Sequence, residues 1–332
     1  MKRLLAVSLA AVTVLISGFG SWSCSPELIP VEMETLTLAA VPTELNALVY
    51  VAQDQGYFTR NGLQVTLKDY DSGATAAAGM LNGEAEVALA AEFPTVRQVF
   101  NKKDIVAFGT VAKYENTYIL WRGDSGIRTF RDLKGKRIGV TLTTISEFYL
   151  GRTLELNGMN IQQVTLVDTR AADAEKALVN GDVDAVVTWE PWVNQIEQHM
   201  GAEVVTRATQ SAQYAYWNLV STTDWTDNHA NAIGRLLKSL DQAEEYVASH
   251  QDKAKAIVKK WMNFEDAYME TIWPRYQFSL SIDQSLITAM EDEARWMIDN
   301  GLTSEKQVPD FLDYIHEDEL KALKPDAVNI IR

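Results

Sequence analysis

Two stretches of the chain share one pattern: LNGEAEVALAAEFP at residues 81–94 and VNGDVDAVVTWEP at residues 179–191. Each stretch follows an Asn-Gly step, a short strand segment and a helical segment, so each belongs to a β-α-β-like unit. The glycine after each helix suits the left-handed cap conformation, and a glutamate follows each final strand. Two similar α/β lobes with a carboxylate at a strand's carboxyl end predict a cleft that closes around a small molecule.

The segments outside the repeat predict two discontinuous lobes. A strand at 35–41 and a helix at 45–59 come before the first unit, and an alternating apolar run at 104–122 can pass from one lobe to the other. Strands are expected at 202–208 and 213–222, and helices at 228–250, 251–262, 264–275, 283–300 and 304–317. We therefore expect lobe 1 at 35–113 and 222–332, lobe 2 at 119–213, and hinge crossovers at 114–118 and 214–221.

The composition excludes some partners. The chain has 332 residues, 47% hydrophobic and 23% charged, with a net charge of −15. These values are typical of a soluble globular protein that is long enough for two lobes. An acidic chain is a poor ligand for nucleic acid or an anionic membrane surface, because phosphate binding needs a basic face.

The N-terminus predicts export from the cytoplasm. Lys2 and Arg3 precede an apolar run at 4–16, which indicates a signal peptide at 1–23 followed by a tether at 24–34. Cys24 is the only cysteine, so an intrachain disulfide is excluded. Its position after the apolar run predicts lipidation and a membrane-anchored protein in the periplasm or at the cell surface. The alternative is a simple secreted protein.

An enzyme is not expected. The four histidines are isolated from one another, and the sequence contains neither HExxH nor GxSxG. With one cysteine, a cysteine-type metal site is excluded as well. We therefore predict no catalytic residue, no metal and no cofactor.

Four segments carry a resemblance to a known family: LVYVAQDQGYFTRNGLQVTL (48–67), DSGATAAAGMLNGEAEVALA (71–90), RDLKGKRIGV (131–140) and ALVNGDVDAVVTWEPW (177–192). In this order the chain resembles solute-binding proteins of ABC importers, in particular the group that binds nitrate, taurine, alkanesulfonates and thiamine pyrimidines. The resemblance implies a two-lobed type II periplasmic-binding fold that delivers a solute to a permease and its ATPase. A monomer is expected. A ligand-sensing accessory protein for a membrane receptor is the alternative.

In this fold the ligand contacts loops at strand ends and the helix N-termini that follow. Backbone N–H groups at such termini favour an anion or a carbonyl oxygen. The candidate ligand-binding residues are Glu44, Asn46, Ser72, Gly73, Thr75, Glu92, Tyr114, Glu115, Thr143, Thr144, Ser146, Trp189, Glu190, Tyr214 and Trp217. Alternatively, Ser72 and Thr144 only cap their helices, and the aromatic residues pack the core or the hinge.

The charged residues in these loops indicate the charge of the solute. Glutamates occur in four of the predicted cleft segments, whereas Lys113 is the only basic residue there. This balance favours a nitrogenous solute, such as an amine, a quaternary ammonium compound or an aminopyrimidine. The alternative is an oxyanion such as a sulfonate or nitrate held by backbone amides, with the glutamates on the lobe rims.

Overall fold

The computed structural model describes residues 33–211 and 213–332. The predictions for the signal peptide, for most of the tether and for Cys24 lie outside these residues. Within them, every helix is too short or too polar to cross a membrane.

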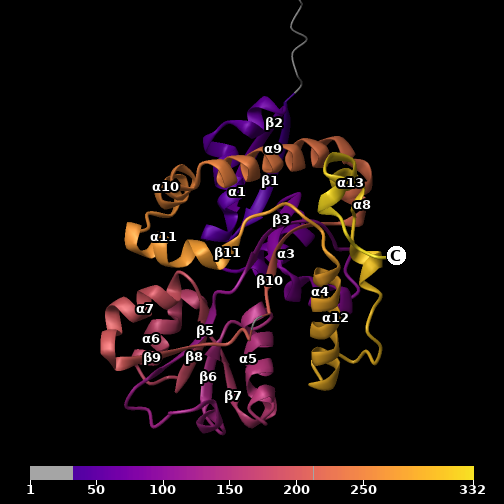
Figure 1. The fold of residues 1–332 in the computed structure, drawn as a ribbon. Coiled ribbons are helices and arrows are strands. Elements are labelled where there is room, and N and C mark those ends of the chain that lie inside the picture. Colours follow the sequence, from indigo (N-terminus) through magenta and orange to yellow (C-terminus); the bar gives the residue numbers. More distant parts are fainter. Residues whose placement is uncertain (1–32, 212) are drawn as a thin grey trace, which may run out of the picture. The chain divides into compact units, whose positions relative to one another are not determined.

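A six-stranded sheet organises the first lobe (Figure 1), with the strand order β11-β4-β10-β3-β1-β2 in the described part of the chain. Its strands are β1 (Glu34–Ala40), β2 (Leu63–Asp69), β3 (Val87–Ala91), β4 (Val106–Tyr114), β10 (Ala215–Ser221) and β11 (Tyr276–Gln277). β1 runs parallel to β2 and β3, while β10 is antiparallel to β3 and β4. The parallel part brings the carboxyl ends of β1 and β3 to one edge, as the first β-α-β unit requires.

The helices of the first lobe come from both ends of the chain. They are α1 (Ala47–Asp54), α2 (Tyr57–Arg60), α3 (Gly73–Leu81), α4 (Glu92–Phe100), α8 (Thr223–Asn228), α9 (Ala230–Ser249), α10 (Gln251–Met262), α11 (Asp266–Ile272), α12 (Gln284–Asp299) and α13 (Asp318–Leu323). The predicted helix 45–59 is divided, because Gly56 adopts a φ of 68° between α1 and α2. The predicted helix 304–317 is wrong: Pro309 interrupts it, and only a 3-10 turn forms at Phe311–Tyr314.

A five-stranded sheet organises the second lobe, in the order β7-β6-β8-β5-β9 for the described residues. Its strands are β5 (Thr117–Arg122), β6 (Arg137–Val140), β7 (Thr165–Asp168), β8 (Ala185–Trp189) and β9 (Val204–Ala208). The helices are α5 (Ile145–Leu156), α6 (Ala174–Val179) and α7 (Trp192–Met200). β6 is parallel to β7 and β8, which repeats the arrangement of the first unit.

Two links join the sheets, and both differ from the predicted crossovers. The first consists of Glu115 and Asn116 between β4 and β5. The second link ends before β10. We expected the residues of β10 in a crossover, but this strand pairs with β3 and β4 inside the first sheet. The side chain of Gln210 connects the links, since its Oε1 accepts hydrogen bonds from the N–H of Asn116 at 2.8 Å and of Thr117 at 3.0 Å.

An aromatic cluster joins the lobes beside these links. Phe93 of α4, Phe148 of α5 and Trp296 of α12 pack with ring centroids 5.5 to 5.8 Å apart. The Trp296 indole lies directly on Gly151 of α5, where a Cβ would come within 2.7 Å of the indole Nε1. Glycine at position 151 is therefore what permits α5 and α12 to approach so closely.

Candidate functional site

A small cavity of about 40 Å³, which we call the inner cavity, lies between the two lobes. The first lobe lines it with Val41, Thr43, Leu45, Gly73, Ala74, Ala91, Pro94, Tyr114 and Trp217, and the second with Thr144, Ile145 and Trp189. Asn116 of the first link completes the wall. The predicted residues Gly73, Tyr114, Thr144, Trp189 and Trp217 therefore meet at one place.

The N-termini of two helices reach the inner cavity, one from each lobe. α3 begins with Gly73 and Ala74, and α5 begins with Ile145. The first amides of a helix have no partner within the helix, and they carry the positive end of its dipole. The two termini therefore present backbone donors to the same small space, which suits a group that accepts hydrogen bonds.

Capping explains two predicted residues that do not line the cavity, Ser72 and Thr75. Ser72 and Thr75 form a reciprocal capping box at the start of α3. Thr144, which alternatively was expected only to cap its helix, makes no side-chain capping bond to α5. The Thr144 hydroxyl donates to the carbonyl of Thr141 at 2.7 Å, and Glu147 instead accepts from the N–H of Thr143.

Asn116 is a polar residue of the cavity wall that the sequence analysis did not select. Its side chain is 1% exposed, and neither Nδ2 nor Oδ1 has a hydrogen-bond partner among the described residues. Buried amides are normally satisfied, so an unpartnered one at a cavity wall is available to a group that enters the cavity. Ser146 in the first turn of α5 is also fully buried, and its Oγ lacks a partner within the described chain.

The aromatic walls are fixed by contacts behind them. The indole N–H of Trp217 donates to Oδ1 of Asn46 at 2.9 Å, and Tyr114 packs edge-on against the same indole with centroids 6.4 Å apart. Asn46 thus orients Trp217 and does not itself line the cavity. Trp189 stands at the end of β8 in the other lobe.

Glu44 and Glu190 are buried behind the cavity. Glu44 accepts hydrogen bonds from the hydroxyls of Tyr268 and Tyr276. Glu190 accepts from the N–H of Asn194 at 3.1 Å and lies 3.8 Å from the guanidinium of Arg275. Burial raises the pKa of each carboxyl to about 7, and for Glu190 the charge of Glu44 adds to this effect.

The other two predicted glutamates, Glu92 and Glu115, do not line the inner cavity either. Glu92 is fully buried and accepts from the N–H of Tyr216 at 2.9 Å beside the buried Glu293. Burial raises the pKa of both carboxyls, which keeps the pair from ionising fully near neutral pH. Glu115 lines a separate cavity of about 340 Å³ at the links, together with Tyr214. No carboxylate of the described residues lines the inner cavity.

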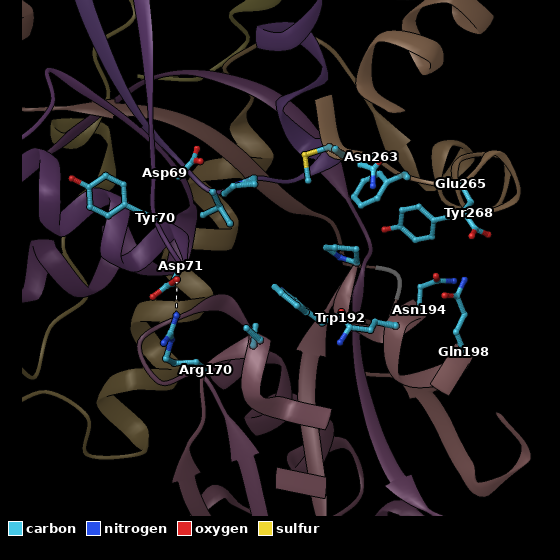
Figure 2. A pocket seen from close by; sticks show the side chains of 18 residues that line it. Asp69, Tyr70, Asp71, Arg170, Trp192, Asn194, Gln198, Asn263, Glu265 and Tyr268 are labelled. Carbon is cyan, nitrogen blue, oxygen red and sulfur yellow. Dashed lines mark ion pairs between the residues drawn. The ribbon is translucent and has the colours of Figure 1, made fainter. Parts of the chain in front are cut away.

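A larger cavity of about 650 Å³, which we call the outer cavity, shares Val41 with the inner one. Figure 2 shows its walls: Asp71 and Tyr268 from the first lobe face Arg170, Trp192 and Asn194 from the second. Arg170 and Asp71 form an ion pair at 2.9 Å across the cavity. The sequence analysis selected none of these five residues as candidates.

This two-lobed α/β fold is that of the periplasmic binding proteins. The family model described as NMT1/THI5 like matches residues 46–254, and the chain belongs to that family.

Individual relatives are distant but similar over most of their length. A putative aliphatic sulfonates-binding protein of Bacillus subtilis (strain 168) is 22% identical over 277 residues, covering 82% of each chain. The taurine-binding periplasmic protein of Escherichia coli (strain K12) is 26% identical over 204 residues, or 60% of this chain and 63% of that one. The alkanesulfonate-binding protein SsuA from Xanthomonas axonopodis pv. citri, bound to MOPS, superposes with a TM-score of 0.75 and 17% identity, covering 86% of this chain and 99% of its own.

Similarity also extends to an enzyme. A 4-amino-5-hydroxymethyl-2-methylpyrimidine phosphate synthase of Aspergillus parasiticus is 27% identical over 149 residues, covering 45% of this chain and 43% of the synthase. Proteins similar to this chain therefore include both binding proteins and an enzyme. Which of the two functions a member has must be inferred from the residues of its site.

Proposed function

We propose that this protein is the extracytoplasmic solute-binding component of an ABC importer. It captures a small organic solute between its lobes and presents it to a permease in the membrane. The similarity to periplasmic sulfonate- and taurine-binding proteins supports this role, as does a cavity whose walls come from both lobes. Contacts made only when the lobes meet on the solute would stabilise the closed form.

One observation carries the proposal for the solute: the N-termini of α3 and α5 and the unpartnered amide of Asn116 converge on the inner cavity. Backbone N–H groups and an amide N–H are the donors that an oxyanion or another acceptor-rich group needs. The acidic side chains that favoured a nitrogenous solute in the sequence have partners outside this cavity. The inner cavity therefore favours the oxyanion alternative for the group that it holds.

The same lining argues against catalysis. Among the described residues, the walls of the inner cavity offer hydroxyls, an amide and indoles, but no histidine, cysteine or carboxylate. Histidine is the commonest general acid or base and carboxylates are frequent ones, and cysteine is an intrinsically strong nucleophile. We therefore propose binding without turnover, as part of the solute-binding role. Lipid anchoring and the monomeric state stay predictions from the sequence.

A thermal-shift screen of the full chain tests the proposal. One panel contains sulfonates, carboxylates and nitrate, and the other contains amines, quaternary ammonium compounds and aminopyrimidines. A solute at a hundred times its Kd stabilises the native state by about 2.7 kcal/mol, which is a readily measured shift. We expect stabilisation by members of the first panel. Shifts from the second panel alone would refute the proposed oxyanion site, and the absence of any shift would refute the binding role.

A further inference from the structure

Any rotation of one lobe against the other has to pass through the two links. The first link is short, because only Glu115 and Asn116 separate β4 from β5. A change in the angle between the lobes therefore requires a change in φ or ψ at or beside these two residues. A group that restrains their backbone also restrains the motion of the lobes.

The side chain of Gln210 in the second link restrains that backbone. Its Oε1 accepts from the N–H groups of Asn116 and Thr117. Its Nε2 donates to the carbonyl of Tyr114 at 3.1 Å and to that of Gln213 at 3.0 Å. A glutamine amide offers two N–H donors and an oxygen that accepts two hydrogen bonds, so its capacity is fully used. The residue is 7% exposed, and all four partners are main-chain groups.

One of these bonds crosses from the second lobe to the first. Gln210 is held on the second lobe, because the N–H and the hydroxyl of the preceding Thr209 both donate to the carbonyl of Thr117 in β5, at 3.1 and 2.9 Å. From there its Nε2 reaches the carbonyl of Tyr114 at the end of β4. One side chain thus binds the residue before the first link and the residue after it. A rotation within the first link has to lengthen or break at least one of these bonds.

The first link borders open space on one side. The cavity of about 340 Å³ beside it is lined by Glu115 and Thr117, by Gln210 and Tyr214, and by residues of the C-terminal segment. A backbone next to open space has room to move, since few van der Waals contacts oppose its motion. This leaves hydrogen bonding as the restraint on that side of the link.

The restrained backbone also belongs to the candidate site. Tyr114 and Asn116, whose main-chain groups Gln210 binds, both line the inner cavity. The same side chain therefore holds part of the cavity wall and the angle between the lobes.

We infer that Gln210 is a positioning residue that braces the hinge. It holds the lobes in the closed arrangement, in which both line the inner cavity, and it limits how often they open. The inference rests on the proposed function only in taking lobe opening as a step of solute capture.

Spin labels on the two lobes test the inference on the full chain without any solute. Cys24 is the only cysteine, so Cys24→Ser confines the labels to two introduced positions. These are Ala256→Cys on α10 of the first lobe and Lys176→Cys on α6 of the second, both at exposed residues. Double electron–electron resonance then measures the distribution of distances between the lobes, in which open chains form the longer population.

Two variants remove the brace. Gln210→Leu loses all four bonds, whereas Gln210→Glu keeps the size of the side chain and its two acceptor bonds. A carboxylate cannot donate to the carbonyls of Tyr114 and Gln213, so the bond between the lobes is lost in both variants. One intramolecular hydrogen bond changes an equilibrium about two- to tenfold. We therefore expect the ratio of open to closed chains to rise about threefold or more.

Asn61→Leu is the matched control. The Nδ2 of Asn61 lies 2.9 to 3.0 Å from three acceptors on α2 and α9, all within the first lobe. This variant also loses hydrogen bonds and should be less stable in urea unfolding. Its distance distribution should nevertheless match that of the unsubstituted chain.

An unchanged or more closed distribution in either Gln210 variant would overturn the inference, and Gln210→Glu alone decides if Gln210→Leu does not fold. An equal shift in Asn61→Leu would overturn it too, because the shift would then reflect a general loss of stability. So would an unsubstituted chain without a closed population. None of these results depends on a solute, whereas the proposed function fails if the thermal-shift screen finds none.

Discussion

Replacing Asn116 by leucine tests whether this residue binds the solute or only supports the fold. Leucine has nearly the same shape as asparagine but no polar atoms. The backbone of residue 116 keeps its bonds, since its N–H donates to Gln210 and its carbonyl accepts from the N–H of Glu190. The substitution therefore removes only the amide that faces the inner cavity.

The burial of the Asn116 side chain determines the sign and size of the expected change in stability. Both polar atoms of the Asn116 side chain are buried without a partner among the described residues. Such burial costs about 1 to 3 kcal/mol, so Asn116→Leu should raise the free energy of unfolding by about 1 kcal/mol or more. The variant should also bind its solute about ten times more weakly, because it loses a hydrogen bond to a charged group.

Asn218 provides the matched control. It is also 1% exposed, but its Oδ1 accepts from the Thr110 hydroxyl at 2.7 Å and its Nδ2 donates to the carbonyl of Tyr216 at 3.1 Å. Asn218→Leu leaves buried groups unpaired and should lower the free energy of unfolding by about 1 to 3 kcal/mol.

Urea unfolding without solute and calorimetry with solute measure both quantities for each variant. A destabilised Asn116→Leu protein that keeps its full affinity would refute the reasoning.

Two further predictions concern packing and pH. Gly151→Ala should lower the free energy of unfolding by about 1 to 3 kcal/mol in urea, because the new Cβ overlaps the Trp296 indole; Gly234→Ala in α9 meets no atom within 4 Å and should be neutral or stabilising by up to about 1 kcal/mol. Equal stability of the two variants would contradict the close contact of α5 with α12. The pKa of Glu44 is about 7 instead of 4.5, so its protonated form is favoured in the folded state. Stability from this group is complete below pH 4.5 and is lost as the pH rises through 7, a loss of about 3 kcal/mol by pH 8. Glu44→Gln should flatten this decline in urea unfolding measured between pH 4.5 and 8, and an unchanged slope would exclude Glu44 as its source.

Local patterns predicted the two β-α-β units well. Asn-Gly steps, alternating apolar residues and strand-end glutamates are short-range features, and β3 and β8 lie close to where these features place them. The first link was less visible, since it is only two residues long and lies between two apolar runs, at 105–114 and 118–121. Hydropathy cannot show where a strand leaves one sheet and enters another.

The candidate site could be predicted only in part, because its partners are distant in sequence. Glu44 is bonded to tyrosines that lie 224 and 232 residues further along the chain, so its sequence neighbours do not indicate that it is buried. Asn116 looked like an ordinary link residue, and only its burial without a partner marks it. Loop composition thus selected five residues that line the inner cavity, but it did not show that the glutamates lie outside this lining.

The central claim is that one small solute is held between the lobes at the inner cavity. Calorimetric titration of the full chain with the solute that gives the largest thermal shift tests it most directly. The account predicts saturation at one solute per chain, with a Kd on the order of micromolar or tighter. No saturable heat from any solute in either panel, or saturation at several solutes per chain, would contradict it.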